Sequence, residues 1–328
     1  MKLTVVLCTF NRCQSLNRAL ESLAASDLPP DTAWEILVVD NNSTDKTRDV
    51  AESFCSKYPS HFRYVFEPTP GKSNALNRGI WEARGDVLAF TDDDVIVEPI
   101  WLWNLTAHLD GKEWAGAAGP VRPQRNLELP SWVPCNERYG LSPLTLFDPG
   151  LDAGPLFESP FGANMAYQKR VFDLYGGFRT DLGPGIGGNT PQKSEDSEFG
   201  RRVLAAGEHI RYEPSATVYH AQSPGRLQRS YFLHWWFDKA RADIRVMSPA
   251  SGRQRRICGV PLIYFARLAA WSMRWMLHMN PAERFSCKIN VWRLAGSIVE
   301  SYHRTKTTES AKSQPVSGKM RCSELKNG

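Results

Sequence analysis

The first 91 residues alternate between apolar runs of strand length and amphipathic runs of helix length, and this order restricts the possible folds most strongly. We predict strands at residues 3–10, 35–40, 62–67 and 86–91. We predict helices between them at residues 13–25, 44–54 and 72–83. Strands that alternate with helices of this length form a parallel sheet that helices cover on both faces. The sequence therefore predicts an α/β fold here.

The composition is that of a soluble globular protein of one or two domains, with 328 residues, 42% hydrophobic and 23% charged. The apolar stretch 257–266 is followed by Arg267, which leaves it far short of the roughly 20 residues that span a bilayer. Seven cysteines without a C-x-x-C pair, and no secretory signal at Met1, predict free thiols and a cytoplasmic location.

Charge is distributed unevenly along the chain. Residues 226–305 hold 14 Lys and Arg against 4 Asp and Glu, and residues 306–328 hold 5 against 2. Residues 1–225 hold 21 against 29, so an acidic part precedes a basic one. This split predicts that the basic part meets an anionic surface.

The later sequence suggests three segments. Residues 1–225 form the predicted catalytic domain, and within it residues 120–160 are expected to be an irregular insert. Residues 226–303 are expected to be a basic, amphipathic helical region. Residues 304–328 are polar and are expected to be disordered.

Polar side chains follow three of the predicted strands, namely Asn11, Asp40 and the cluster Asp92–Asp94. Ligands of parallel α/β sheets bind beyond the carboxyl ends of the strands, so these groups are expected at one edge. Alternate residues of an extended chain share a face, which directs Asp92 and Asp94 to the same side. Two carboxylates there suit Mg²⁺ or Mn²⁺, and the alternative is a solvated acidic turn.

Three other stretches hold candidate site residues. Gly71-Lys72-Ser73 resembles the end of a P-loop, but Phe66 occupies the first glycine position, so we reject that motif. Lys72 can still bind a phosphate at a helix N-terminus. Ser194 is expected to cap the helix that begins with Glu195 and Asp196, either of which could act as a general base. His220 ends an apolar run.

Taken together, the chain over residues 3–225 resembles a family 2 glycosyltransferase with the GT-A fold. The resemblance rests on motifs in a fixed order. These are VVLCTFNR (5–12), ILVVDNNSTD (36–45), GKSNALNRGI (71–80), FTDDD (90–94), FGANMAYQKRVFDLYGGF (161–178) and EDSEFGRRV (195–203). The fold that the resemblance implies is a mostly parallel sheet flanked by helices, followed here by a C-terminal helical region.

The resemblance implies roles for particular residues. Asp196 matches the catalytic base, and Asp94 and His220 match ligands of a divalent cation, Mn²⁺ or Mg²⁺. Asp92 matches the ribose-binding acid of the D-x-D motif, with Asp93 able to share either role. The remaining implied donor-binding residues are Thr9, Phe10, Asn11, Arg12, Asp40 (at the base), Lys72, Asn77, Gly162, Ala163, Asn164 and Glu195.

The implied activity is inverting transfer of a sugar from a nucleotide-sugar, most simply a UDP-sugar, to a hydroxyl of a glycan or lipid-linked acceptor. The alternatives are a nucleotidyltransferase and an inactive protein that binds nucleotide-sugar or lipid. A nucleotidyltransferase would need a glycine-rich loop after the first strand, where this chain has CTFNR. Five tryptophans after residue 226 come without any nucleic-acid motif, so we expect no nucleic-acid partner.

Residues 253–303 favour a helix that lies in a membrane interface. Arg267 and Arg274 are seven residues apart and share a helical face. The apolar side is supplied by Phe265, Leu268, Trp271, Trp275 and Leu277. Basic residues beside tryptophan suit an anionic lipid surface, and they predict peripheral attachment to the inner face of the membrane. The alternative is a helix that packs on the catalytic domain with a solvated basic face.

Overall fold

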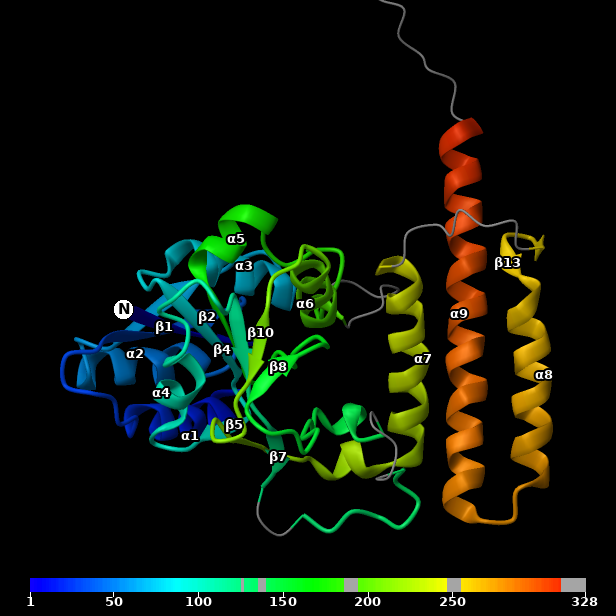
Figure 1. Cartoon of the computed structure of the whole chain (residues 1–328), viewed down its shortest axis with the longest axis horizontal. Helices are drawn as coiled ribbons and strands as arrows, with labels where there is room; N and C mark the ends of the chain where they lie inside the picture. The colour runs from blue at the N-terminus through cyan, green and yellow to red at the C-terminus, as the bar shows by residue number, and fades with distance from the viewer. Residues whose placement is uncertain (125–126, 135–139, 186–193, 247–254, 314–328) are drawn as a thin grey trace, which may run out of the picture.

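A computed structural model describes residues 1–124, 127–134, 140–185, 194–246 and 255–313, with side chains up to residue 306. An α/β part is followed by a layer of three long helices (Figure 1). A cleft lies where these two parts meet.

Four neighbouring parallel strands form the first half of the main sheet, in the order β3-β2-β1-β4. Their bounds are Lys2–Thr9 (β1), Ala33–Asp40 (β2), Phe62–Phe66 (β3) and Val87–Asp92 (β4). Val5, Val6 and Leu7 are fully buried because helices cover both faces, which explains the unbroken apolar runs in the sequence. The connecting helices are Cys13–Ala24 (α1), Thr47–Lys57 (α2) and Lys72–Glu82 (α3). The predicted strands and helices are confirmed, with ends within about three residues.

The second half of the sheet continues in the order β9-β6-β10-β8. Its strands are Gly116–Ala118 (β6), Gly154–Leu156 (β8), Met165–Gln168 (β9) and Ile210–Tyr212 (β10). Strand β9 is antiparallel to both β4 and β6, and β8 is antiparallel to β10. The sheet is therefore mostly parallel rather than wholly so. Around it lie Trp101–Thr106 (α4), Lys169–Tyr175 (α5) and Glu195–Ala205 (α6).

A smaller sheet brings distant parts of the chain together. Its strands are Val95–Val97 (β5), Val121–Pro123 (β7) and Val218–His220 (β11), in the order β5-β11-β7. In the antiparallel pairing of β11 with β5, His220 lies opposite Val95. This register places the histidine beside the acidic turn that precedes β5.

The segment 120–160 is more ordered than the sequence suggested. Besides β7 and β8 it contains the 3-10 turn η1 (Ser142–Leu144). Leu144 and Leu146 join Phe232 and Phe285 of the C-terminal helices in a second hydrophobic core. The sequence pattern of this segment did not predict its part in the second core, because its apolar residues pack against helices more than 80 positions away.

The C-terminal helices are Arg229–Val246 (α7), Leu262–Leu277 (α8) and Pro281–Ser313 (α9), with the short turn η2 (Pro224–Leu227) before α7. A two-residue hairpin, β12 (Arg256–Ile257) and β13 (Val260–Pro261), precedes α8. Helix α9 packs between α7 and α8 (Figure 1). The buried carboxylate of Glu300 on α9 accepts from Arg241, at 3.1 Å, and Arg245, at 2.6 Å, both on α7.

The end of the helical region was predicted too early. Residues 304–313 form the last turns of α9, so the expectation of disorder is wrong for them. Residues 314–328 lie outside the described residues. Helix α8 does not pack on the α/β part: it lies against α9, and none of its residues is buried. None of the described helices combines the length and the apolarity that a membrane crossing requires.

Candidate functional site

A cleft of about 740 Å³ lies between the carboxyl ends of the central strands and helix α7. Strands β1, β2 and β4 end together, with Cys8 paired to Asp92 and Thr9 paired to Asp40. The predicted residues that line the cleft are Thr9, Phe10, Arg12, Lys72, Asp92, Asp93, Asp94, Gly162, Ala163, Glu195, Asp196 and His220. Most of the residues that the sequence singled out therefore meet in one place.

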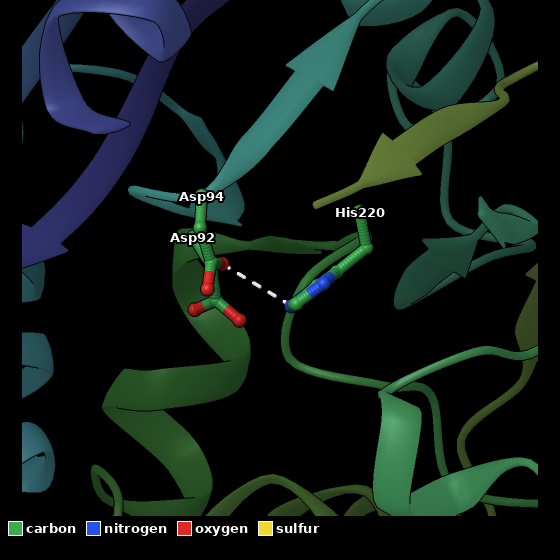
Figure 2. A group of neighbouring side chains, drawn as sticks. All are labelled: Asp92, Asp94 and His220. Atoms are coloured by element: carbon green, nitrogen blue, oxygen red, sulfur yellow. Dashed lines mark ion pairs between the residues drawn. The ribbon is translucent and has the colours of Figure 1, made fainter. Parts of the chain in front are cut away.

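The acidic cluster forms a tight turn between β4, which ends at Asp92, and β5, which begins at Val95. Asp92 and Asp94 lie beside one another and face the imidazole of His220 (Figure 2). One ligand atom from each of these three side chains falls within 4.8 Å of the others. The prediction that Asp92 and Asp94 share a side is correct, although a turn rather than an extended strand produces it.

Asp93 is not part of this group of three and is buried at 5% exposure. Its carboxylate accepts hydrogen bonds from the Thr9 hydroxyl at 2.8 Å and from Arg12 Nη1 at 3.0 Å. Burial raises the pKa of Asp93 to about 6, although the positive charge of Arg12 counteracts part of that rise. These two hydrogen bonds hold Asp93, the middle residue of the acidic cluster, in place.

Asp94 is surrounded by positive and polar groups. Arg12 Nη1 lies 2.7 Å and Arg226 Nη2 3.6 Å from its Oδ2, and His220 Nε2 lies 3.2 Å from its Oδ1. Burial alone would raise the pKa of Asp94, but the hydrogen bond and charge of His220, with the two guanidinium groups, lower it below the usual range. The sequence analysis missed Arg226, because an isolated arginine six residues after His220 carries no motif.

His220 is buried, and both of its ring nitrogens lie close to polar groups. Its Nδ1 lies 2.8 Å from the carbonyl oxygen of Ala221 and 3.1 Å from the amide nitrogen of Gln222. Its Nε2 faces the carboxylate of Asp94 and is therefore the ring atom that would ligate a cation together with Asp92 and Asp94. Two carboxylates and one imidazole nitrogen form a donor set that fits Mn²⁺, whereas Mg²⁺ favours oxygen ligands alone.

Lys72 begins helix α3 and places its ammonium group 2.5 Å from Asp92 Oδ1. Burial by itself would lower the pKa of Lys72, but the charges of Asp92 and Glu195 outweigh it and raise that pKa. Glu195 is buried nearby, where burial and the charge of Asp196 raise its pKa to about 7. Lys72 therefore links the acidic turn to the start of α6.

Asp196 stands in the first turn of α6 and lines the cleft. Its Oδ2 accepts the Gly162 backbone N–H at 2.9 Å, and its Oδ1 accepts the Ser197 N–H at 2.6 Å. These bonds fix the carboxylate, and a helix N-terminus favours its negative charge. The expected Ser194 cap is wrong, because the Ser194 side chain makes no capping bond, and within the described part of the chain its buried Oγ has no hydrogen-bond partner.

Four predicted donor-binding residues, Asn11, Asp40, Asn77 and Asn164, are not among the described residues that line the cleft. Asn11 has a positive φ of 51°, and its Oδ1 accepts the Thr44 N–H at 2.7 Å, so it holds the loop after β2. Asp40 is buried and accepts from the hydroxyl of Tyr64 at 3.0 Å.

Asn77 and Asn164 make hydrogen bonds within the fold. Asn77 exchanges two bonds of 2.8 Å with the backbone of Phe178, which ties α3 to the chain after α5. Asn164 is fully buried, where its Oδ1 accepts from Trp101 Nε1 at 2.9 Å and its amide donates to the carbonyls of Pro120 and Ala216. Both amide hydrogens of Asn164 and one lone pair of its Oδ1 are thus used within the protein.

The sequence analysis also missed one whole wall of the cleft. Helix α7 contributes Tyr231, Trp235, Trp236, Lys239 and Asp243, and α9 contributes Arg293. These residues belong to the segment 226–303, which we predicted only as a basic, amphipathic helical region. The spacing of positions 231, 235, 239 and 243 by four was the signal that could have placed them on one helical face.

The family model of glycosyl transferase family 2 matches residues 4–175, slightly more than half of the chain. The chain belongs to glycosyl transferase family 2, as the motifs indicated, and it is a glycosyltransferase. It is 25% identical over 265 residues to the succinoglycan biosynthesis protein ExoM of Rhizobium meliloti, covering 80% of both chains. It is 27% identical over 277 residues to the glucosyl-dolichyl phosphate glucuronosyltransferase of Haloferax volcanii, covering 80% of this chain and 84% of that protein.

Two solved structures show the same fold at low identity. The mannosyltransferase PcManGT from Pyrobaculum calidifontis, in complex with GDP-Man and Mn²⁺, has a TM-score of 0.56 and 17% identity, covering 95% of this chain and 76% of that one. TarS 1–349 of S. aureus, in complex with UDP-GlcNAc, has a TM-score of 0.52 and 17% identity, covering 95% and 92%. The predicted GT-A fold is therefore confirmed.

The contacts of Asn164 lead to a test of whether this residue holds the fold or the donor. Asn164→Ala leaves the buried Trp101 N–H and the Ala216 carbonyl without these bonds, whereas the Pro120 carbonyl keeps the Val218 N–H, so we expect a loss of about 3 kcal/mol in the free energy of unfolding. Urea denaturation measures this loss. As a control, Asn17→Ala removes only a surface bond to Glu21 and should change stability by less than about 0.5 kcal/mol. Unchanged stability with weaker donor binding would favour the donor role instead.

Proposed function

We propose that this chain is an inverting, metal-dependent glycosyltransferase that moves a sugar from a nucleotide diphosphate sugar to an acceptor hydroxyl. The observation that carries the proposal is a single cleft that holds both a candidate cation site, Asp92, Asp94 and His220, and a fixed carboxylate, Asp196. The solved relatives with GDP-Man and with UDP-GlcNAc support a nucleotide-sugar as donor, and a UDP-sugar is the first donor to test.

The side chains around the acidic turn suit a diphosphate. Asp92, Asp94 and His220 would hold the cation, and the Mn²⁺ in the PcManGT complex supports Mn²⁺ as that ion. A bound divalent cation supplies positive charge that stabilises the leaving nucleoside diphosphate. Arg12, Lys72 and Arg226 line the same cleft and add positive charge that attracts an anionic donor. The negative charge of Glu195 acts on Lys72, and Asp93 accepts a hydrogen bond from Arg12.

Asp196 is the proposed base. Its carboxylate, fixed by Gly162 and Ser197, takes the proton of the acceptor hydroxyl as that oxygen bonds to the anomeric carbon. The bond from the anomeric carbon to the diphosphate breaks in the same displacement, and the nucleoside diphosphate leaves. Attack from the face opposite the leaving group inverts the anomeric configuration. The nearest enzymatic alternative, a nucleotidyltransferase, would release pyrophosphate instead.

A thermal-shift panel tests the donor and the cation together. We expect a UDP-sugar or GDP-sugar at about 100 times its dissociation constant to raise Tm by several degrees, with Mn²⁺ enlarging the shift. Asp94→Ala should lose the metal-dependent part, whereas the exposed control Asp31→Ala should keep it. No shift with any nucleotide-sugar would contradict the proposal, and an equal shift in Asp94→Ala would place the cation elsewhere.

Replacement of the proposed base tests the chemical step. Asp196→Asn keeps the side-chain volume but cannot take the proton, so we expect transfer to fall at least about 100-fold while donor binding persists. The released product is quantified as nucleoside diphosphate, and the anomeric configuration of the glycoside is read by NMR. The exposed Asp173→Asn on α5 is the control and should retain full activity. Tight donor binding without turnover in the wild type would instead support an inactive sugar-nucleotide binding protein.

Helix α8 supports a second part of the proposal, attachment to an anionic membrane surface during polysaccharide or glycan assembly. Between residues 255 and 282 the chain has four arginines and no acidic residue. The exposed face of α8 carries an apolar stripe at helical spacing, formed by Leu262, Phe265, Ala269, Met273 and Met276. Exposed apolar groups beside arginine suit the interface of an anionic bilayer.

Vesicle flotation tests this surface. We expect the protein to float with phosphatidylglycerol vesicles and much less with phosphatidylcholine vesicles, because the arginines need anionic lipid. Replacing Met273 and Met276 together by Glu should reduce binding at least tenfold, since each buried apolar side chain contributes about 1–2 kcal/mol. Leu174→Glu, at an exposed position on α5, is the matched control. A wild-type dimer that this double replacement converts to a monomer would show that α8 binds a second copy instead.

A further inference from the structure

Aromatic side chains from both parts of the protein meet at the cleft, and the donor and cation roles do not use them. Phe157, which follows β8, lines the cleft with 87% of its surface exposed. On the other side, Tyr231 and Trp235 of α7 line it and are only partly buried. A large aromatic side chain that remains exposed beside a concave site marks a surface for a ligand.

The α7 side of this group is close to the helix that carries Asp196. Arg201 of α6 lies 3.7 Å from Asp243 of α7, and Asp243 also pairs with Lys239 at 2.6 Å. The ion pair between Arg201 and Asp243 thus joins α6 to α7, which face one another in Figure 1. The hydroxyl of Ser159, two residues after Phe157, donates to the backbone carbonyl of Asp196 at 3.0 Å. Both aromatic sides therefore approach the proposed base.

The same wall contains an unused polar group. Trp236 lines the cleft at 7% exposure, and its buried indole N–H has no hydrogen-bond partner among the residues that the structure describes. The ring itself is held by Trp235, at a centroid distance of 4.9 Å, and by Arg293 of α9, whose guanidinium lies 4.6 Å from the centroid. Buried donors in proteins are normally paired, so this N–H points to a bound acceptor atom or a water.

Aromatic faces beside hydrogen-bonding groups match the chemistry of a sugar ring. A pyranose presents C–H groups on its faces, which pack on aromatic rings, and hydroxyls at its edge. Lys239, Arg201 and the Trp236 N–H offer donors for those hydroxyls, and Glu158 and Asp243 offer acceptors. A phosphate placed directly on a lipid would need positive charge rather than aromatic faces, yet the charges of these ionised groups nearly balance.

We propose that the groove between Phe157 and helix α7 is the acceptor subsite, and that the accepting unit is a sugar ring stacked on Trp235. Phe157 covers the second side of the ring. The accepting hydroxyl is thereby presented to Asp196. This inference rests on the proposed function, which does not specify the chemical class of the acceptor. It adds that the group which receives the sugar is a carbohydrate and not a lipid phosphate.

Kinetics with the full-length protein test the subsite. The donor is the nucleotide-sugar that raises Tm, and the probes are octyl glycosides of glucose, galactose, mannose and N-acetylglucosamine, with dodecyl phosphate as the lipid phosphate. We expect at least one octyl glycoside, and not dodecyl phosphate, to accelerate release of nucleoside diphosphate. Trp235→Ala and Phe157→Ala should each lower kcat/KM for that glycoside about tenfold, while the KM of the donor stays within about twofold.

Two further variants separate stacking from folding. Trp235→Tyr keeps an aromatic face and should recover most of kcat/KM for the glycoside, which a purely structural role of the indole would not predict. Trp81→Ala removes an exposed tryptophan on α3, away from the cleft, and should leave both constants unchanged. Since Phe157 is exposed, its replacement is expected to leave Tm unchanged.

The outcomes distinguish failure of this inference from failure of the proposed function. If no nucleoside diphosphate is released in any condition, not even by slow hydrolysis of the donor by water, the proposed function itself is contradicted. Acceleration by dodecyl phosphate alone, or by none of the glycosides while hydrolysis persists, would overturn the carbohydrate acceptor. An unchanged KM for the active glycoside in both Trp235→Ala and Phe157→Ala would place the acceptor elsewhere on the protein.

Discussion

Repulsion among three adjacent carboxylates is the constraint on which the arrangement of the rest of the site depends. Two carboxylate oxygens less than 5 Å apart repel by on the order of 3 kcal/mol at the effective dielectric of a protein surface. The fold offsets this cost by bonding Asp93 to Thr9 and Arg12, and by surrounding the other two with positive and polar groups. Those groups are Arg12, Lys72, His220 and Arg226, which come from four separate elements or loops.

The same electrostatic balance changes the meaning of the uneven charge along the chain. Part of the basic excess after residue 226 is used inside the protein, because Arg226 reaches Asp94 and Arg241 and Arg245 pair with the buried Glu300. The cationic residues left on the surface of the C-terminal helices include Arg267 and Arg274 of α8. The uneven charge along the chain is thus partly neutralised by ion pairs inside the fold, both between the two parts and within the C-terminal helices.

The sequence predicted secondary structure well where one physical pattern dominated. The strands and helices up to residue 92 were clear because buried parallel strands need unbroken apolar runs and covering helices need one apolar face. Segment 120–160 and the capping of α6 at Ser194 were not predicted correctly. Their conformation depends on distant contacts, such as the second core around Phe232 and the strained φ of 80° at Ser194, which no local pattern encodes.

By itself the sequence determined the α/β order, the family motifs and the group of acids that ends β4, because these follow from local periodicity and from adjacent residues. Only the tertiary structure decided which polar residues face the cleft. It turned Asn77 and Asn164 into internal hydrogen-bonding groups, brought Arg226 to Asp94, and made α7 a wall of the site. The physical reason is that side-chain direction depends on the register of β11 against β5, set by residues more than 100 positions apart, and on the packing of helices that are distant in the sequence.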